Sequence, residues 1–239
     1  RWGHRWTFIV GLAGFTLASL ACGLSGSGEQ LIVARVVQGL AAGLFFPAVT
    51  ALIQLTFAGR ARGRAFAVMG AAIGFSSALG PLVGGLLVTA SWRWIFLVNV
   101  PIGLIALWVG WIKLPRVPGH EVPAPSYWAA LLVTAGIGAL TFGIVKLNDG
   151  GAGAATAASS FAAAAAMLAL FVAHCLRSDN PFVNPALFRI RDFTRATLTI
   201  APFSTAFGGF LLSLVLWEES VWHWPAMKIG LAIAPGPFM

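Results

Sequence analysis

The stretch AFAVMGAAIGFSSALGPLVGGLLV, residues 65–88, contains no charged side chain and decides the fold class of this sequence. A helix needs about 20 consecutive apolar residues to cross the hydrocarbon core of a bilayer. Outward from this stretch, similar runs follow one another along the chain. They occupy residues 6–26, 30–57, 94–112, 128–146, 155–176 and 197–217, and a further run begins near residue 228. The sequence therefore predicts seven complete membrane-spanning helices and part of an eighth.

The composition agrees with this pattern. The 239 residues are 59% hydrophobic and 9% charged. A soluble domain carries about 25% charged residues, so this chain lacks the polar side chains to cover a water-facing surface. In lipid every backbone polar group needs an internal partner, and the apolar runs are too long for barrel strands. We therefore expect an all-α membrane protein surrounded by the lipid bilayer.

The net charge of +8 comes from basic residues in short loops between the apolar runs, which argues against a nucleic-acid partner. One set of alternate loops holds Arg1, Arg5, Arg60, Arg62, Arg64, Lys113, Arg116, Arg177, Arg189, Arg191 and Arg195. The other set holds Arg93, Lys146 and Lys228. Because basic residues stay on the inner side of a membrane, the first set is predicted to be cytoplasmic. The protein is predicted to be a multi-pass protein of the inner (plasma) membrane.

Other residue classes exclude several functions. Cys22 and Cys175 lie in apolar runs and the four histidines are scattered, so we predict no metal site and no cofactor. No nucleophile and base are paired in a recognisable pattern, which argues against an enzyme. The seven acidic residues fall in loops or at the edges of spans, so no carboxylate lies well inside a span.

Two polar stretches interrupt the spans. Residues 114–127 contain four prolines and are predicted to form a linker, and residues 177–196 form a polar loop. The Gly-, Ala- and Ser-rich residues 150–166 are predicted to be a loop that leads into a tightly packed helix. Because the chain begins without Met and ends inside an apolar run, we expect an internal piece of a longer protein.

A first motif surrounds the one charge that lies clearly within a span, Arg35. It consists of Arg35, Gln38, Gly39, Gly43 and Pro47, and at helical spacing the first four share a face. A charge buried in lipid costs at least about 2.5 kcal/mol. The Arg35 side chain either snorkels to the outer interface or faces the interior of a helix bundle, near a path for protons or substrate.

A second motif lies in the opening stretch and consists of Ser76, Gly80, Pro81, Gly84 and Gly85. Ser76, Gly80 and Gly84 recur every four residues, so one stripe of the helix lacks bulk and admits another helix. Pro81 removes a backbone donor and is expected to bend the helix there. We expect the Gly80–Gly84 stripe to make the close contact.

A third motif opens the fourth span. It consists of Trp92, Arg93, Trp94, Phe96, Asn99, Pro101 and Gly103. The tryptophans suit a membrane interface. Asn99 and Pro101, just inside the span, predict a bent helix start whose backbone groups find local partners.

These three motifs are similar to those of a known family. The first resembles the fourth-helix motif of major facilitator transporters, and the second resembles the antiporter motif of their fifth helix. The third is similar to the start of the sixth helix in the fourteen-helix drug:proton antiporters of that superfamily. The sequence departs from the antiporter motif at Ser76, where the family has glycine.

The resemblance implies a partial major facilitator superfamily helical bundle, about helices three to ten of fourteen. Residues 1–113 would be part of the N-terminal bundle (helices three to six), and 114–127 a cytoplasmic linker. Residues 128–176 would form an inserted helix pair, and 177–239 a cytoplasmic loop and the start of the C-terminal bundle.

The resemblance also implies a function: export of small hydrophobic, often cationic drugs in exchange for protons, by alternating access. It assigns Arg35 and Gln38 to proton coupling, together with a carboxylate expected outside this chain. The small residues and prolines of the first two motifs would serve packing and gating.

Two alternatives remain open from the sequence. One is secondary transport of another substrate, such as an amino acid or siderophore, or in the direction of uptake. The other is a membrane scaffold without a transport cycle. The Gly80-Pro81 pair favours export, and Arg35 argues against a scaffold, which needs no buried charge.

Overall fold

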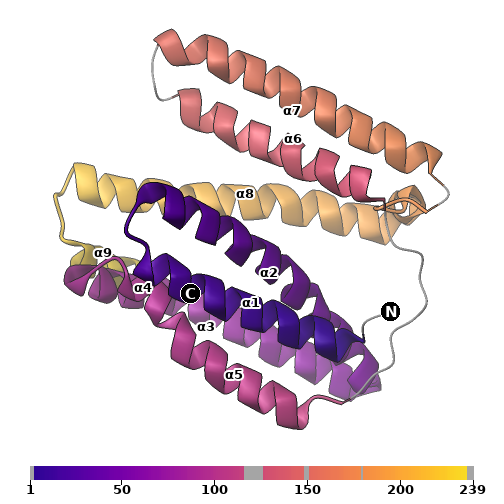
Figure 1. The fold of residues 1–239 in the computed structure, drawn as a ribbon, viewed down its shortest axis with the longest axis horizontal. Coiled ribbons are helices and arrows are strands. Elements are labelled where there is room, and N and C mark those ends of the chain that lie inside the picture. Colours follow the sequence, from indigo (N-terminus) through magenta and orange to yellow (C-terminus); the bar gives the residue numbers. More distant parts are fainter. Residues whose placement is uncertain (1–2, 116–125, 148–150, 179, 236–239) are drawn as a thin grey trace. The chain divides into compact units, whose positions relative to one another are not determined.

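The structure, a computed structural model, describes residues 3–115, 126–147, 151–178 and 180–235. Its elements are α1 (His4–Leu24), α2 (Gly28–Thr56), α3 (Gly59–Ala90), α4 (Trp94–Leu97), α5 (Asn99–Lys113), α6 (Tyr127–Lys146), α7 (Gly151–Arg177), the 3₁₀ helix η2 (Pro185–Arg189), α8 (Arg191–Ser220) and α9 (Ala226–Ile233) (Figure 1). Seven helices, with α4 and α5 counted as one, are long and apolar enough to cross a membrane. This confirms the predicted all-α membrane fold and its seven spans.

Several helices are longer than the apolar runs that predicted them. α3 begins at Gly59, before the run at 65–88, and α8 reaches from Arg191 to Ser220. Hydropathy marks the segment that suits lipid, whereas the backbone hydrogen bonds of a helix continue into the polar interface. The predicted loop at 150–166 is wrong, because α7 is helical from Gly151 on. Alanine is the best helix former, so this Ala-rich stretch extends the helix.

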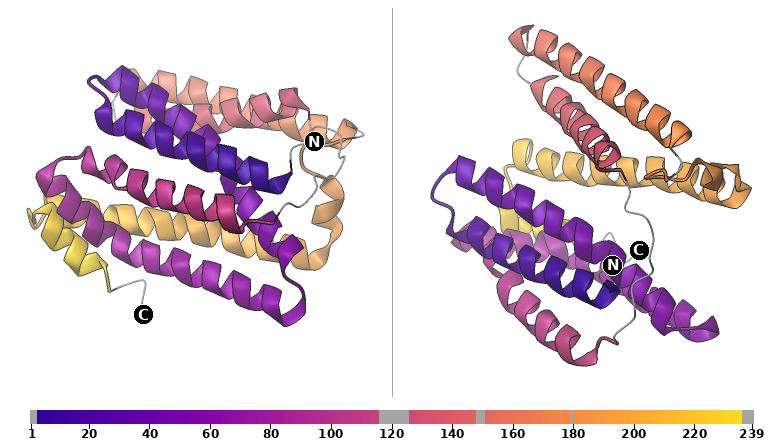
Figure 2. Two further views of the ribbon diagram at one scale, coloured as in Figure 1. Left: turned by 60° about the horizontal axis from the view of Figure 1, so that its bottom comes forward. Right: turned by 45° about the vertical axis from the view of Figure 1, so that its right-hand side comes forward.

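The chain divides into two compact units. The first comprises Arg1–Glu121 with Gly209–Met239, and the second comprises Val122–Gly208. In the first unit α1 packs along α2 and contacts α4 and α5, while α3 contacts α4 and α9 (Figure 1). In the second unit α6 and α7 form a hairpin (Figure 2). The finer division expected from the sequence stays a prediction, and most of its linker, residues 116–125, lies outside the described residues.

Small side chains hold α1 against α2. Ala18, Cys22 and Ala41 are buried there, and a Cβ atom on Gly11 would lie 2.8 Å from the backbone nitrogen of Phe45. In a membrane, such close approach stabilises helix pairs through van der Waals contact. By contrast, large apolar side chains on the helix surfaces, Trp108 among them, are exposed and suit contact with lipid.

The two helices of the hairpin in the second unit also approach closely at glycines. A Cβ atom on Gly136 would lie 3.0 Å from the side chain of Leu168, and one on Gly143 would lie 2.8 Å from the ring of Phe161. The two glycines are seven residues apart and therefore share a face of α6. α7 packs along that face.

The turn between α1 and α2 fixes where the first motif begins. The Ser27 hydroxyl accepts a hydrogen bond from the backbone nitrogen of Gln30 at 3.3 Å. The Gln30 side-chain oxygen accepts one from the backbone nitrogen of Gly26 at 2.9 Å. This arrangement resembles a capping box, which satisfies free donors at a helix start. Arg35 lies two turns further along α2.

Candidate functional site

Arg35 makes two directed contacts in the first unit. Its Nη1 donates a hydrogen bond to Oε1 of Gln38 at 2.7 Å. Its guanidinium carbon lies 5.7 Å from the centroid of the Phe96 ring on α4. Gln38 is 2% exposed, while Arg35 itself is exposed in the described structure. The structure thus brings together two residues of the first motif with one of the third.

A hydrogen-bonded layer behind these contacts holds them in place. The Ser19 hydroxyl donates to the Phe96 carbonyl oxygen at 3.0 Å, and Asn99 Nδ2 donates to the Ser19 oxygen at 3.1 Å. Cys22 Sγ lies 3.9 Å from the Gln38 oxygen that Arg35 binds. Ser19 and Cys22 are fully buried. We call these residues the Arg35 cluster: Ser19, Cys22, Arg35, Gln38, Phe96 and Asn99.

The other polar residue of the third motif, Arg93, closes the end of α1. Its Nη2 donates to the carbonyl oxygen of Ser25, the C-cap residue of α1, at 3.0 Å. Its guanidinium lies 4.7 Å from the Trp92 ring centroid. A cation is favourable at the negative end of a helix. The Trp94 side chain is 50% exposed.

A one-residue break separates α4 from α5 at Val98, whose backbone angles stay helical, so the bent helix start remains a prediction. Pro101 has no backbone N–H, so the usual bond to the Leu97 carbonyl is missing. Asn99 Nδ2 donates to the neighbouring Ile95 carbonyl at 3.4 Å. A Cβ atom on Gly103 would collide with the Thr16 side chain, so this glycine lets α5 lie against α1.

The remaining small residues of the first two motifs face open space. A Cβ atom on Gly39, Gly43, Gly80 or Gly84 would meet no atom of the described residues within 4 Å. Pro47 is exposed in the middle of α2. Ser76 lines a cavity of about 470 Å³ between α2 and α3, opposite the rings of Phe45 and Phe46.

A neighbouring helix does approach the second motif closely, but on a different stripe. A Cβ atom on Gly85 would collide with the Ala226 carbonyl oxygen, and one on Gly230 would collide with the Pro81 carbonyl oxygen and lie 2.9 Å from Leu82 Cα. We call this contact the α3–α9 seam. In this helix pair α9 contacts Pro81, Leu82 and Gly85 rather than Gly80 and Gly84, so the close contact expected for the Gly80–Gly84 stripe stays a prediction. Residues 80 and 81 differ by about 100° around the helix, and the sequence did not show which stripe a partner would use.

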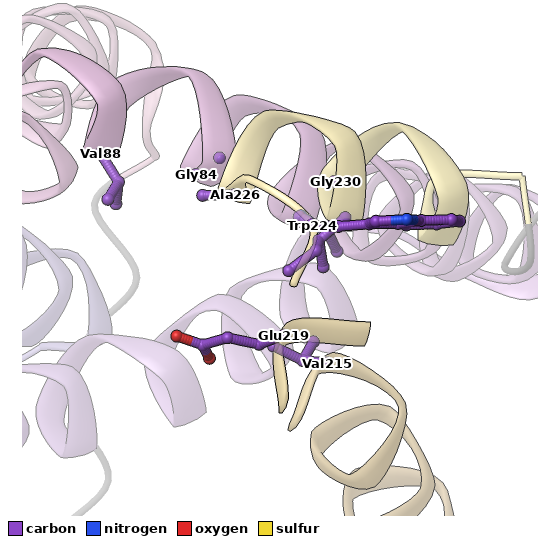
Figure 3. A pocket seen from close by; sticks show the side chains of 10 residues that line it. Gly84, Val88, Val215, Glu219, Trp224, Ala226 and Gly230 are labelled. Atoms are coloured by element: carbon purple, nitrogen blue, oxygen red, sulfur yellow. The ribbon is translucent and has the colours of Figure 1, made fainter. Parts of the chain in front are cut away.

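Sequence reasoning missed the side chains beside this seam. Glu219 and Val215 of α8 line the same pocket as residues of α3 and α9, and Figure 3 shows the Trp224 ring next to Gly230. The preceding residue, Glu218, is 4% exposed, and its Oε2 has no hydrogen-bond partner among the described residues. Both carboxylates are at the end of the span, as the sequence indicated. The signal was two adjacent acids followed by Trp222, Trp224 and a proline.

The chain is similar in sequence to several known proteins. The family model described as Major Facilitator Superfamily matches residues 1–239. The tetracenomycin C resistance and export protein of Streptomyces glaucescens is 32% identical over 98% of this chain and 44% of the relative. The methylenomycin A resistance protein of Bacillus subtilis is 34% identical over 91% of this chain and 47% of the relative. The multidrug resistance protein B homolog of Mycobacterium tuberculosis is 34% identical over 98% and 44%. The chain spans less than half the length of these curated relatives.

Proposed function

Because the chain belongs to the major facilitator superfamily, we propose that its full-length protein exports small hydrophobic or cationic drugs in exchange for protons. The family and the relatives are transporters, not enzymes. The chain is accordingly a multi-pass protein of the inner (plasma) membrane. Substrate class, direction and the coupling ion are the proposal.

The names of the relatives support export of drugs. The Streptomyces glaucescens protein is named for resistance and export, and the other two for resistance. They match almost the whole chain, at 32 to 34% identity. A membrane scaffold without a transport cycle would not explain three relatives with names of this kind.

The observation that carries proton coupling is the placement of Arg35. Its hydrogen bond to Gln38 and its contact with the Phe96 ring direct the guanidinium along α2 and α4, within the first unit. The hydrogen bond to Gln38, one turn further from the Gly28 end of α2, supports the interior orientation over a snorkelling one. An arginine held in this way can stabilise a carboxylate or release it when the carboxylate takes up a proton. The carboxylate is expected outside the described residues.

The α3–α9 seam supports alternating access. Gly85 of α3 lies against the backbone of Ala226. Gly230 of α9 lies against the backbone of Pro81 and Leu82. Small residues let the two backbones approach closely here, so the contact can form again whenever the two helices return to this position. In the proposed cycle α3 and α9 belong to different halves of the transporter, and the seam closes its outer side.

The test is exchange in proteoliposomes that contain the full-length protein. A proton gradient, acidic on the side to which drug is exported, should drive uphill movement of ethidium, and the movement should acidify the opposite compartment. A protonophore should abolish uphill movement but not downhill movement. Uphill transport that persists with the protonophore, and follows a sodium gradient, would contradict proton coupling.

Sidedness has its own test. Single cysteines at Arg62 and at Gly151 are predicted to react with an impermeant maleimide from opposite sides of oriented cells, because the basic loops are cytoplasmic. Cysteines at Arg62 and Arg189 should react from the same side and serve as the matched pair. Labelling of positions 62 and 151 from one side would contradict the predicted topology.

A further inference from the structure

A pocket opens beside the α3–α9 seam. It has a volume of about 400 Å³, and residues of α3, of the end of α8, and of α9 with its preceding turn line it (Figure 3). All of them belong to the first unit. Pockets for drug-sized ligands have volumes of roughly 300 to 1,000 Å³. The pocket is therefore large enough for a small organic molecule.

One charged group stands in an otherwise apolar lining. Glu219 is the single charged residue that lines the pocket, and Val88 and Val215 form part of the apolar walls. In Figure 3 the Glu219 side chain extends away from α8 and lies across the pocket from Gly84 and Val88 of α3. Glu219 is exposed and makes no ion pair among the residues that the structure describes. Its charge is thus available to a ligand.

The aromatic wall contributes apolar area rather than a free ring face. Trp224 lines the pocket, but the Lys228 ammonium lies 4.0 Å from its ring centroid. The Trp222 ring centroid lies 4.6 Å from that of Trp224. A ligand cation would therefore be attracted by the Glu219 carboxylate, while its apolar body contacts the walls.

The chemistry selects the kind of cation. A single carboxylate among valine and glycine residues does not offer the several oxygen ligands that Mg²⁺ or Ca²⁺ requires. An organic cation with a large apolar body gains binding free energy in two ways. The Glu219 carboxylate attracts its charge at low dielectric, and the apolar walls bury its apolar surface. A neutral drug would gain only the second.

We propose that this pocket, which we call the Glu219 pocket, binds a lipophilic organic monocation. The ligand class rests on the proposed function, because an exporter of cationic drugs is the protein that meets such molecules. The pocket lies at the end of α3 and α8 opposite their basic first turns, where Arg60 and Arg191 stand. With those turns in the cytoplasm, the Glu219 pocket is in the outer half of the membrane, where an exported cation leaves.

The experiment measures how readily the Glu219 carboxylate is chemically labelled. The full-length protein is placed in phosphatidylglycerol nanodiscs and treated with a water-soluble carbodiimide and an amine, and peptide mass spectrometry measures labelling of each carboxylate. The probe is tetraphenylphosphonium, and tetraphenylborate is the anion of matched shape. Asp192, an exposed carboxylate in the first turn of α8 and thus at the other end of the helix that carries Glu219, is the internal control within the same molecule.

We expect tetraphenylphosphonium, at about ten times its Kd, to lower Glu219 labelling about tenfold and to leave Asp192 unchanged. Tetraphenylborate should protect neither residue. Val215→Trp fills the pocket but keeps the carboxylate, so Glu219 should then be labelled equally with and without the cation. Equal labelling of Glu219 in the unmodified protein under both conditions would overturn the proposal. Equal protection of Asp192, or protection that survives Val215→Trp, would overturn it as well.

A lipid amine headgroup shares the cationic chemistry, and the lipid composition separates the two ligands. In nanodiscs that contain phosphatidylethanolamine, tetraphenylphosphonium should still protect Glu219. Protection by phosphatidylethanolamine alone, with no further effect of the drug cation, would overturn the assignment to a free cation. Ethidium transport is measured separately. If Glu219 is protected but ethidium is not exported, the proposed function is wrong and the proposed cation site stands. If ethidium is exported but Glu219 is not protected, the proposed function stands and the cation site is wrong.

Discussion

The Arg35 cluster and the α3–α9 seam lie in the same unit but are built in opposite ways. In the cluster, side chains from α1, α2 and the α4–α5 break are joined by hydrogen bonds of 2.7 to 3.1 Å, as between Arg35 and Gln38 or Asn99 and Ser19. In the seam, glycines let the backbones of α3 and α9 meet at Gly85 and Gly230, and Ile229 and Ile233 of α9 are buried. Directed hydrogen bonds fix one geometry, whereas apolar contacts have no preferred direction. The cluster thus has the properties of a fixed centre and the seam those of a moving interface.

Arg35→Ala tests the cluster and should have the largest effect. Removal of the only charge placed clearly within a span should abolish proton-driven ethidium efflux, at least about a hundredfold, as expected when a group essential to the cycle is lost. Drug-for-drug exchange without a proton gradient should persist, because it needs no proton step. Efflux and exchange are measured in proteoliposomes at matched protein levels. Unchanged proton-driven efflux would show that Arg35 snorkels and that the cluster is ordinary packing.

Gly85→Leu tests the seam against the rest of the same helix. The leucine side chain would occupy the position of the Ala226 carbonyl, so we expect efflux to fall about tenfold or more, consistent with a misplaced structural element. Gly63→Leu is the matched control in α3, because this glycine lies outside the second motif and a Cβ atom there meets no described atom within 4 Å. Its efflux should stay within about twofold, the range of a substitution at a site without special contacts. A larger loss for Gly80→Leu than for Gly85→Leu would move the functional contact back to the Gly80–Gly84 stripe.

Phe96→Leu separates the ring from the hydrogen bonds of the cluster. Leucine keeps the apolar bulk and the carbonyl bonded to Ser19 but removes the cation–π contact, which is worth about 0.5 to 1 kcal/mol at exposed sites. We expect the rate of proton-driven efflux to fall about threefold, the factor that corresponds to such an energy. Trp94→Leu, two residues away and without a contact to Arg35 among the described interactions, should leave the rate unchanged. Equal effects at both positions would remove Phe96 from the cluster.

Ser19→Ala should have the smallest effect, on stability rather than transport. The alanine leaves the Phe96 carbonyl and the Asn99 amide without the Ser19 hydroxyl, a loss of about 1 kcal/mol. We expect the midpoint of thermal denaturation in detergent to fall by a few degrees, roughly the shift that such an energy gives in a chain of this size. Ser159→Ala removes an exposed bond within α7 and is the control. No shift at Ser19 would mean that water replaces the bonds.

The sequence predicted more of the contacts in the Arg35 cluster than of those in the α3–α9 seam. Arg35 and Gln38 stand three residues apart on one helix, so their hydrogen bond follows from helical geometry alone. Phe96 and Asn99 lie far along the chain from Ser19, and nothing in the spacing of residues predicts which side chains meet between distant helices. Ser19 and Cys22 were missed for that reason, since a buried serine and cysteine look like ordinary small residues in an apolar run.

The sequence by itself determined the all-α membrane fold, the seven spans and the single charge within them. These properties follow from local composition, because lipid demands about 20 apolar residues in each crossing and an internal partner for every backbone group. Only the tertiary structure decided that α9 contacts the Pro81–Gly85 stripe, that the Phe96 ring lies next to the Arg35 guanidinium, and that Glu219 is the one charged residue lining its pocket. These contacts depend on the rotation of each helix about its axis. Several stripes of α3 are equally small, so only the packing of the helices fixes that rotation.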